Sequence, residues 1–352
     1  MNTKSVCEIT CGGLLASVLA YKAYKYFSKK QVPTSKADEK VKYFIGIDLG
    51  ATNAKAGVVR GDGVLVARSS SSLVDYSVEG VVKALVEASQ KAVEEAKMTF
   101  ADITAIGVGS PGCIDFSKGV VTKASNFPTW VDVPLAQLIQ DQTHVPTFLE
   151  NDANAAVLAE LWVGAGANCD NLVMLTLGSG IGGGVVTNGK LVHGGSGWAG
   201  EPGHQIYELE GIPCGCGQRG CYEKYASANA VINHANEKLK ASEKPSSLRT
   251  IEKITAKDVV NAAKNSDEIA LECVEIAAKA LGICCVNLFR VLDPQVIVFT
   301  GGLANAGDFL LDKIKGYIDH YNWTIQPSTC QILPSRAGPD AGIIGAAAVG
   351  RA

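Results

Sequence analysis

The pattern of hydrophobic and polar positions predicts a strand-rich unit that occurs twice in the chain. From Tyr43, the segment YFIGIDLGATNAKAGVVRGDGVLVARS predicts a strand, a glycine-rich turn, a second strand, an Asp-Gly hairpin turn and a third strand. From Leu172, the segment LVMLTLGSGIGGGVVTNGKLVHGG repeats this plan, with an Asn-Gly turn at Asn188 and Gly189. Two copies of one unit indicate duplicated domains.

Helical and strand-like patterns alternate around these units. Residues 78–97 and 154–162 predict helices, and residues 103–112 predict a buried strand that ends in a turn. Later segments predict long helices at 256–290, a strand entering a glycine-rich loop at 294–304, and a closing apolar helix at 342–350. The chain is therefore predicted to be an α/β protein of two lobes, with its substrate site in the central cleft.

Composition supports two core-forming domains and a reduced interior. The 352 residues are 47% hydrophobic and 19% charged, which is typical of globular proteins. Residues 1–42 carry a net charge of +5 and the remainder carries −8, so the body does not indicate nucleic-acid binding. Several of the 11 cysteines lie in apolar stretches, such as Cys273, Cys284 and Cys285, and are predicted to be reduced core residues.

The N-terminal segment has its own character. Residues 1–30 predict a membrane anchor or targeting segment, because a charge-free stretch at 9–21 precedes a lysine-rich flank, and residues 31–42 predict a polar linker. The stretch of 13 residues spans roughly 20 Å, short of a ~30 Å hydrocarbon core unless Lys22 and Lys25 snorkel. The favoured interpretation is a cytosol-facing body anchored at a mitochondrial or plastid outer membrane. A cleaved signal peptide or an organelle transit segment is the alternative, giving an imported or a soluble cytosolic protein after processing.

Two glycine-rich segments are candidate phosphate loops. In DLGATN (48–53), glycine lets the backbone approach a phosphate, and Asp48 is placed to hold Mg²⁺ through water. The segment TLGSGIGGG (176–184) satisfies the G-x-G-x-x-G spacing of dinucleotide-binding loops, but a hairpin follows it instead of a helix. It is therefore predicted to clamp phosphate between strands. For both segments the alternative is a structural turn.

The segment ENDANAAVLAE (150–160) offers a general base. Asp152 lies where a predicted strand passes into a helix, so its carboxylate can point into the cleft beside Asn151 and take a proton from a substrate hydroxyl. The alternative is that an Asp or Asn here only caps the helix.

A cluster of histidine and cysteine indicates a metal site. Residues 201–223 place one imidazole and three thiolates within eighteen positions, the donor set of a tetrahedral structural Zn²⁺: His204, Cys214, Cys216 and Cys221. Redox or disulfide use of the cysteines is the competing interpretation. The cluster is predicted to fix the loop that presents Glu201 and Glu223.

Five segments together resemble the ROK family of sugar kinases and regulators over residues 43–352. They are DLGAT, SPGCID, ENDANA, GEPGH and CGCGQRGC, in the order in which the family has them. The resemblance implies a duplicated, actin-like ATPase (ribonuclease H-like) fold of two lobes with a central cleft. The expected small lobe is 43–150, with the C-terminal helix at 341–352 packed back on it, and the expected large lobe is 151–340.

The resemblance also implies roles for individual residues. Asp152 matches the catalytic base, and the expected sugar contacts are Ser110, Pro111, Gly112, Asn126, Asn151, Asp152, Glu201, His204 and Glu223. The expected phosphate loops are Asp48, Gly50, Ala51, Thr52 and Asn53, and Thr176, Gly178, Ser179, Gly180 and Gly182, with an adenosine loop at Gly301 and Gly302. Ala51 departs from the family pattern, which usually has glycine there.

The implied activity is phosphorylation of glucose to glucose 6-phosphate by ATP with Mg²⁺ and a structural Zn²⁺. Alternatives are a kinase for mannose, fructose, N-acetylglucosamine or N-acetylmannosamine, and a non-catalytic sugar-sensing regulator. The residues before the core are apolar and then basic and supply no helix-turn-helix, which argues against a DNA-binding repressor. A homodimer or homotetramer is expected from the family.

Overall fold

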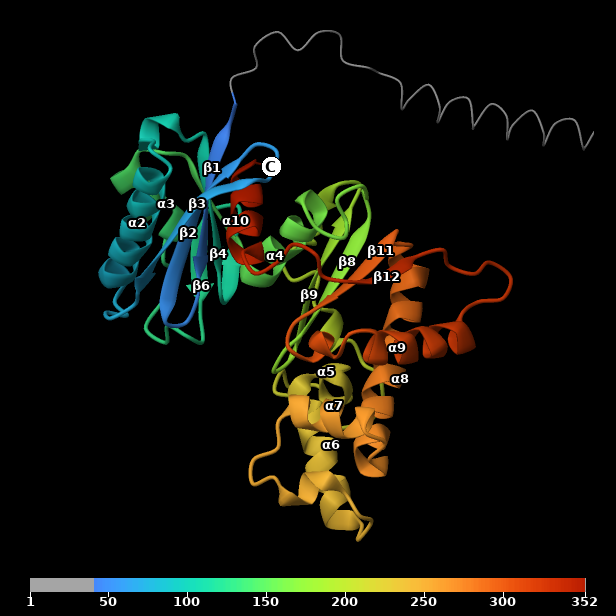
Figure 1. Ribbon diagram of the computed structural model, residues 1–352. Coiled ribbons are helices and arrows are strands. Elements are labelled where there is room, and N and C mark those ends of the chain that lie inside the picture. The colour runs from blue at the N-terminus through green and yellow to red at the C-terminus, as the bar shows by residue number, and fades with distance from the viewer. Residues whose placement is uncertain (1–40, 352) are drawn as a thin grey trace, which may run out of the picture. The chain divides into compact units, whose positions relative to one another are not determined.

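Two five-stranded sheets with the same strand order form the framework of the computed structural model, which describes residues 41–351 (Figure 1). The first sheet has the order β3-β2-β1-β4-β7, and the second has the order β10-β9-β8-β11-β12. In both, the first three strands form an antiparallel meander and the last two run parallel to the first strand. The predicted duplication is therefore confirmed.

The strands of the first sheet are β1 (Tyr43–Leu49), β2 (Asn53–Arg60), β3 (Leu65–Ser72), β4 (Ala105–Ser110) and β7 (Thr147–Asn151). Those of the second are β8 (Leu172–Leu177), β9 (Ile181–Thr187), β10 (Lys190–Leu191), β11 (Val296–Thr300) and β12 (Gln331–Pro334). A separate hairpin is formed by β5 (Cys113–Asp115) and β6 (Val120–Lys123).

Helices cover these sheets. The first half has α2 (Val78–Glu95) and α3 (Leu135–Thr143), whose apolar residues share one core with the first sheet. The second half has α5 (Glu223–Ala226), α6 (Ala228–Ala241), α7 (Ala256–Lys264), α8 (Glu268–Leu292) and α9 (Asp308–Tyr321). Two more helices, α4 (Asp152–Trp162) and α10 (Ala341–Arg351), pack on each other next to the first sheet (Figure 1). The predicted helices at 78–97, 154–162 and 342–350 are thus confirmed to within two residues at their ends.

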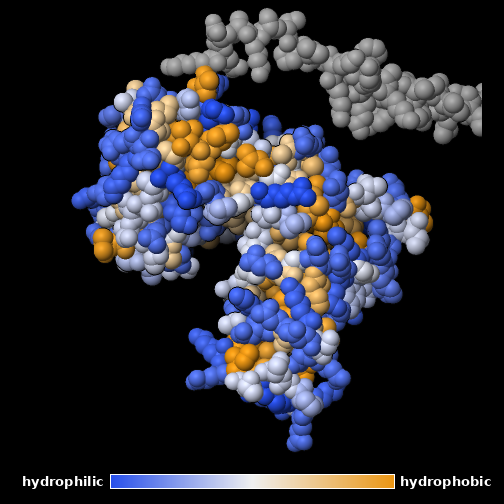
Figure 2. All heavy atoms as spheres, viewed as in Figure 1, coloured by the Kyte–Doolittle hydropathy of each residue, from blue (hydrophilic) through white to orange (hydrophobic). Residues whose placement is uncertain are grey.

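Helix α10 lies on a row of three glycines that crosses the first sheet. Gly57, Gly46 and Gly107 are aligned in register on β2, β1 and β4. A Cβ added at Gly46 would lie 1.8 Å from the carbonyl oxygen of Ile343, and one added at Gly107 would lie 1.8 Å from that of Ala346. The backbone of α10 therefore rests directly on the sheet, where no side chain fits between them. The face shown in Figure 2 is largely polar, with an apolar area over α10 and the neighbouring strands.

A buried carboxylate ties α4 to the segment that leads into α10. The side chain of Glu160 accepts hydrogen bonds from Ser335 Oγ at 2.5 Å and from the backbone N–H groups of Ala337 at 3.0 Å and Ala165 at 2.7 Å. Arg336 N donates a further bond at 3.0 Å. A buried carboxylate needs such donors to replace lost water, and these anchor the C-terminal segment at the end of α4.

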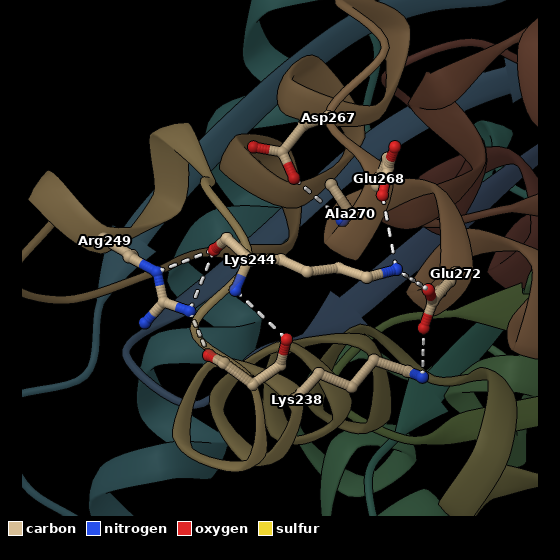
Figure 3. A network of polar contacts seen from close by, with 8 residues as sticks. Lys238, Lys244, Arg249, Asp267, Glu268, Ala270 and Glu272 are labelled. Atoms are coloured by element: carbon tan, nitrogen blue, oxygen red, sulfur yellow. Dashed lines mark hydrogen bonds and ion pairs between the residues drawn. The ribbon is translucent and has the colours of Figure 1, made fainter.

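In the second half, Arg249 satisfies the open end of helix α6. The last carbonyl groups of a helix lack intrahelical partners. The guanidinium donates to the carbonyl oxygens of Leu239 and Lys244, both at 3.0 Å, and also to that of Ser242. Lys244, whose carbonyl group Arg249 contacts, forms ion pairs with α8 (Figure 3). Its Nζ lies 3.2 Å from Glu268 Oε2 and 3.5 Å from Glu272 Oε1.

The N-terminal segment and the lobe boundaries remain predictions from the sequence. The N-terminal anchor and most of the linker lie outside the described residues, and among residues 41–351 no helix is long and apolar enough to cross a membrane. The described residues from Lys42 onward form one compact unit, and the boundaries of the two expected lobes stay a prediction.

The glycine row generates a stability prediction. Gly107→Ala places a methyl group against the backbone of α10, and we expect it to lower the free energy of unfolding by about 3 kcal/mol. Gly316→Ala on α9 is the matched control, because no atom lies within 4 Å of its added Cβ and alanine favours a helix by about 0.5–1 kcal/mol. Urea unfolding followed by circular dichroism measures both. Equal stability of the two variants would contradict the close packing.

Candidate functional site

A cavity of about 430 Å³ lies where three segments meet. These are the β5–β6 hairpin, the junction between β7 and α4, and the loop that follows β10. Its lining includes three of the expected sugar-binding residues, Gly112, Asn151 and Glu201. The strands β1, β4 and β7 are parallel, and their carboxyl ends meet at this edge of the sheet. This edge is where α/β proteins place their ligands.

Asn151 caps helix α4 and so leaves Asp152 available. The side-chain oxygen of Asn151 accepts from the backbone N–H groups of Ala153 at 2.9 Å and Asn154 at 3.4 Å, while its Nδ2 donates to Gly112 O at 3.3 Å. Asp152 is the first residue of the helix, and in the described part of the chain its carboxylate accepts a hydrogen bond only from Ala153 N, at 2.8 Å. The cap expected as an alternative for this segment is thus made by Asn151.

Burial and two neighbouring carboxylates act on Asp152 at this junction. The pKa of Asp152 is raised above its ordinary value, chiefly because surrounding protein atoms desolvate the carboxylate and also because Asp48 and Glu201 add negative charge. Burial likewise raises the pKa of Asp48, against an opposing effect of Lys55. A base with a raised pKa holds an abstracted proton more readily near neutral pH. The arrangement suits proton transfer and the binding of a cation.

The two glycine-rich loops form tight turns. In the first, Gly50 N donates to Asn53 O at 3.0 Å and Thr52 and Asn53 are exposed. In the second, Gly178 N donates to Gly180 O at 3.0 Å. A Cβ at Gly180 would lie 2.1 Å from the Glu223 carboxylate, which explains the glycine there.

A second cavity adjoins the expected adenosine loop. It has a volume of about 260 Å³ and is lined by Gly302 and by residues of α7, among them Lys257, Asn261 and Lys264. Gly301, just before it, has φ of +92° and lies against the backbone of Leu177, so a larger residue there would be strained. The lysines and Asn261 of this cavity were not predicted, because α7 shows only an ordinary amphipathic pattern in the sequence.

The cysteine and histidine cluster comes together as predicted. The candidate ligand atoms of His204, Cys214, Cys216 and Cys221 all lie within 4.8 Å of one another. Cys216 Sγ and Cys221 Sγ are 3.6 Å apart, and Cys214 Sγ lies 3.8 Å from His204 Nδ1. Ligands about 2.3 Å from a tetrahedral Zn²⁺ are separated by roughly 3.8 Å, so the donor atoms fit this ion.

Glu223 connects this cluster to the second glycine-rich loop. Its Oε2 accepts from Ile181 N at 3.0 Å, and its Oε1 lies 3.9 Å from Cys214 Sγ. Glu223 therefore does not line the larger cavity among the described residues, whereas Glu201 does.

Other expected sugar contacts lie apart from the cavity, and unexpected residues line it. Asn126 is exposed, and Ser110 is buried with its hydroxyl donating to Pro111 O at 3.2 Å. The lining that the sequence did not indicate includes Glu150, His193, Phe116 and Trp198. Glu150 and His193 lie 43 positions apart, so no local pattern could have paired them.

Curated relatives of the chain include kinases and regulators. A glucokinase from Thermotoga maritima is 36% identical over 309 residues, which cover 87% of this chain and 96% of that protein. A xylose repressor from Bacillus subtilis is 29% identical over 314 residues, which cover 89% of this chain and 78% of that protein.

These relatives overturn the expected localisation. The glucokinases of Thermotoga maritima, Halalkalibacterium halodurans and Streptomyces coelicolor are bacterial proteins, and bacteria have neither mitochondria nor plastids. Anchoring at a mitochondrial or plastid outer membrane was therefore a wrong inference. Its physical basis was weak, because the 13-residue apolar stretch spans only about two thirds of a ~30 Å hydrocarbon core.

Solved structures of similar proteins have the same fold. A ROK family glucokinase from Streptomyces griseus, solved in complex with glucose and AMPPNP, is 31% identical with a TM-score of 0.69, covering 88% of this chain and 99% of that chain. The expected duplicated, actin-like α/β fold is thereby confirmed. The model of the ROK family matches residues 44–352, and the chain therefore belongs to the ROK family.

Proposed function

We propose that this protein phosphorylates glucose at its 6-hydroxyl with ATP, with Asp152 as the general base. One observation carries this proposal. Asp152 directly follows Asn151, which lines the larger cavity, and the pKa of its carboxyl is raised by burial, with the negative charges of Asp48 and Glu201 adding to the shift.

The coarser activity, that of an ATP-dependent sugar kinase, rests on the relatives. The glucokinase from Thermotoga maritima spans nearly the same length, and the Streptomyces griseus structure holds both a sugar and an ATP analogue. Preference for glucose is the finer part of the proposal, because kinases for other hexoses or N-acetylhexosamines share the family fold.

The proposed mechanism assigns one task to each part of the site. Asp152 accepts the proton of the sugar hydroxyl as phosphoryl transfer proceeds. Asn151, Gly112 and Glu201 hold the sugar in the cavity so that this hydroxyl faces Asp152. Asp48 is placed to hold Mg²⁺, which neutralises phosphate charge when bound with ATP. The glycine-rich loops 48–53 and 176–182 would lie beside the phosphates of ATP. Gly302, which lines the second cavity, would border the nucleoside together with Gly301.

Zinc is proposed as a structural ion of the loop 201–223. His204, Cys214, Cys216 and Cys221 would hold it, and it would stabilise a loop that has little apolar core of its own. Nδ1 of His204 lies 3.8 Å from Cys214 Sγ and would be the metal ligand, and contact of the other ring nitrogen with a sugar hydroxyl stays a prediction from the family. Glu223 would transmit the rigidity of the loop to the second phosphate loop through Ile181 N.

A sugar-sensing regulator is the second candidate, and the similarity to the xylose repressor favours it. Such a protein needs the sugar cavity but no base. The raised pKa of Asp152 and the presence of both glycine-rich loops favour the kinase. A homodimer or homotetramer stays a prediction from the family.

The test of the function is a coupled phosphorylation assay with MgATP and a panel of sugars: glucose, mannose, fructose, N-acetylglucosamine and N-acetylmannosamine. We expect the highest kcat/KM with glucose. Preference for another sugar would overturn the specificity and keep the mechanism. A folded protein that phosphorylates none of the five would favour the regulator.

Asp152→Asn tests the base. The amide keeps the shape of the side chain and cannot take a proton, so kcat should fall about a hundredfold or more, while sugar affinity stays within about tenfold. Asp319→Asn, at an exposed position of α9, is the control for the same chemical change. Turnover by Asp152→Asn at the control's rate would remove Asp152 from the mechanism.

Cys216→Ser tests the metal site. Loss of one thiolate should lower the zinc content of the purified protein well below one ion per chain and raise KM for the sugar. Cys330→Ser, outside the cluster, is the control. Metal analysis by atomic emission measures the content, and equal zinc in both variants would contradict the ligand assignment.

A further inference from the structure

A histidine outside the expected catalytic set joins the two sides of the larger cavity. His193 Nε2 lies 2.6 Å from Glu150 Oε2. The Glu150 carboxylate is buried, and its other oxygen accepts from Asn151 N at 2.9 Å and from Asn154 Nδ2 at 3.0 Å. Every donor that this buried carboxylate receives thus belongs to the cavity or to the start of helix α4. A charge-assisted bond of this kind is about twice as strong as a neutral one.

An aromatic ring covers one face of the His193 imidazole. Phe116, in the turn of the β5–β6 hairpin, stacks on His193 with ring centroids 3.7 Å apart and an interplanar angle of 19°. A Cβ on Gly197 would lie 3.6 Å from the same phenyl ring. The hairpin therefore touches the loop after β10 at two points. Both segments line the cavity.

The loop after β10 is rich in glycine, so these contacts bear on how it is held. Gly194, Gly197 and Gly200 all have positive φ and carry no side chain that could pack. Glycine-rich backbone loses much entropy on ordering, so such a loop needs an external contact to hold one conformation. Among the described residues of this loop, His193 makes the side-chain contacts that supply it.

His193 differs from His234, which is an ordinary core histidine. His234 lies buried in the second half beside Tyr225, and its Nε2 has no hydrogen-bond partner in the described part of the chain. His193 is instead part-exposed to the cavity and bonded to a carboxylate that directly precedes Asn151 and Asp152.

We propose that His193 is a positioning residue of the sugar site. Glu150 and Phe116 clamp its imidazole, and this clamp holds the β5–β6 hairpin and the loop 193–200 together as one wall of the cavity. The proposal rests on the proposed sugar-kinase function for its ligand, and it concerns substrate affinity more than the proton transfer at Asp152.

The kinetic test compares five variants with the wild type. His193→Ala should raise KM for glucose about tenfold or more, because a bond to a charged partner is lost, with a smaller change in kcat. His193→Gln keeps a donor for Glu150 and should recover part of the affinity. Phe116→Ala should raise KM, and Phe116→Tyr, which keeps the stacked ring, should not. The double variant with alanine at 193 and 116 should be no worse than His193→Ala alone, because the two residues act as a unit.

A second measurement does not depend on activity. Hydrogen–deuterium exchange of peptides covering residues 113–123 should become several-fold faster in His193→Ala, although the substitution lies in another segment. His320→Ala, an exposed histidine on α9, is the control and should change neither KM nor exchange.

The outcomes separate the two proposals. If the wild type phosphorylates no sugar, the proposed function fails, and the exchange experiment still decides whether the clamp exists. If the wild type is active and His193→Ala leaves both KM and exchange at residues 113–123 unchanged, the clamp is overturned. A lowered melting temperature with unchanged KM would assign His193 to the scaffold alone and would also overturn it.

Discussion

The close contact of helix α10 with a row of glycines is the constraint on which the arrangement of the site depends. Gly46 and Gly107 bring the helix backbone onto strands β1 and β4. Gly345 of the same helix packs against the carbonyl group of Ala155 on α4, and a Cβ at Gly342 would strike the Asp48 carboxylate. One helix thus sets the distance between the strand that ends near Asp48 and the helix that begins with Asp152. Protein interiors are packed tightly enough that this distance cannot drift.

The same packing brings like charges together at the carboxyl ends of parallel strands. Burial raises the pKa of both Asp48 and Asp152, and the negative charge of Asp48 adds to the unfavourable ionisation of Asp152. The protein retains this unfavourable arrangement, as proteins commonly do where function requires it. A bound cation near Asp48 would relieve it.

Two other buried carboxylates differ from Asp152 because each accepts several hydrogen bonds from protein donors. Glu160 receives four protein donors and fastens the C-terminal segment to α4. Glu150 receives backbone, amide and imidazole donors and fastens the loop after β10 to the start of the same helix. Helix α4 therefore carries a carboxylate anchor beside each of its ends, while Asp152 at its first position is left without a cationic partner among the described residues. Rigid support around a free carboxylate is what a positioned base requires.

The amino-acid sequence alone predicts the duplicated strand pattern, the helices with clear apolar periodicity and the cysteine and histidine cluster, and it makes Asp152 a candidate base. These features depend on short spacings, and periodicity, turn residues and ligand types are local properties of a chain. Tertiary packing was needed to show that Asn151 is the helix cap, that Asn126 does not line the larger cavity, and that Glu223 bonds to the second glycine-rich loop. It alone paired Glu150 with His193 and placed α10 on the glycine row. Those contacts join positions from about forty to nearly three hundred residues apart, and such pairings are set by how the two sheets and their helices pack, which no local pattern encodes.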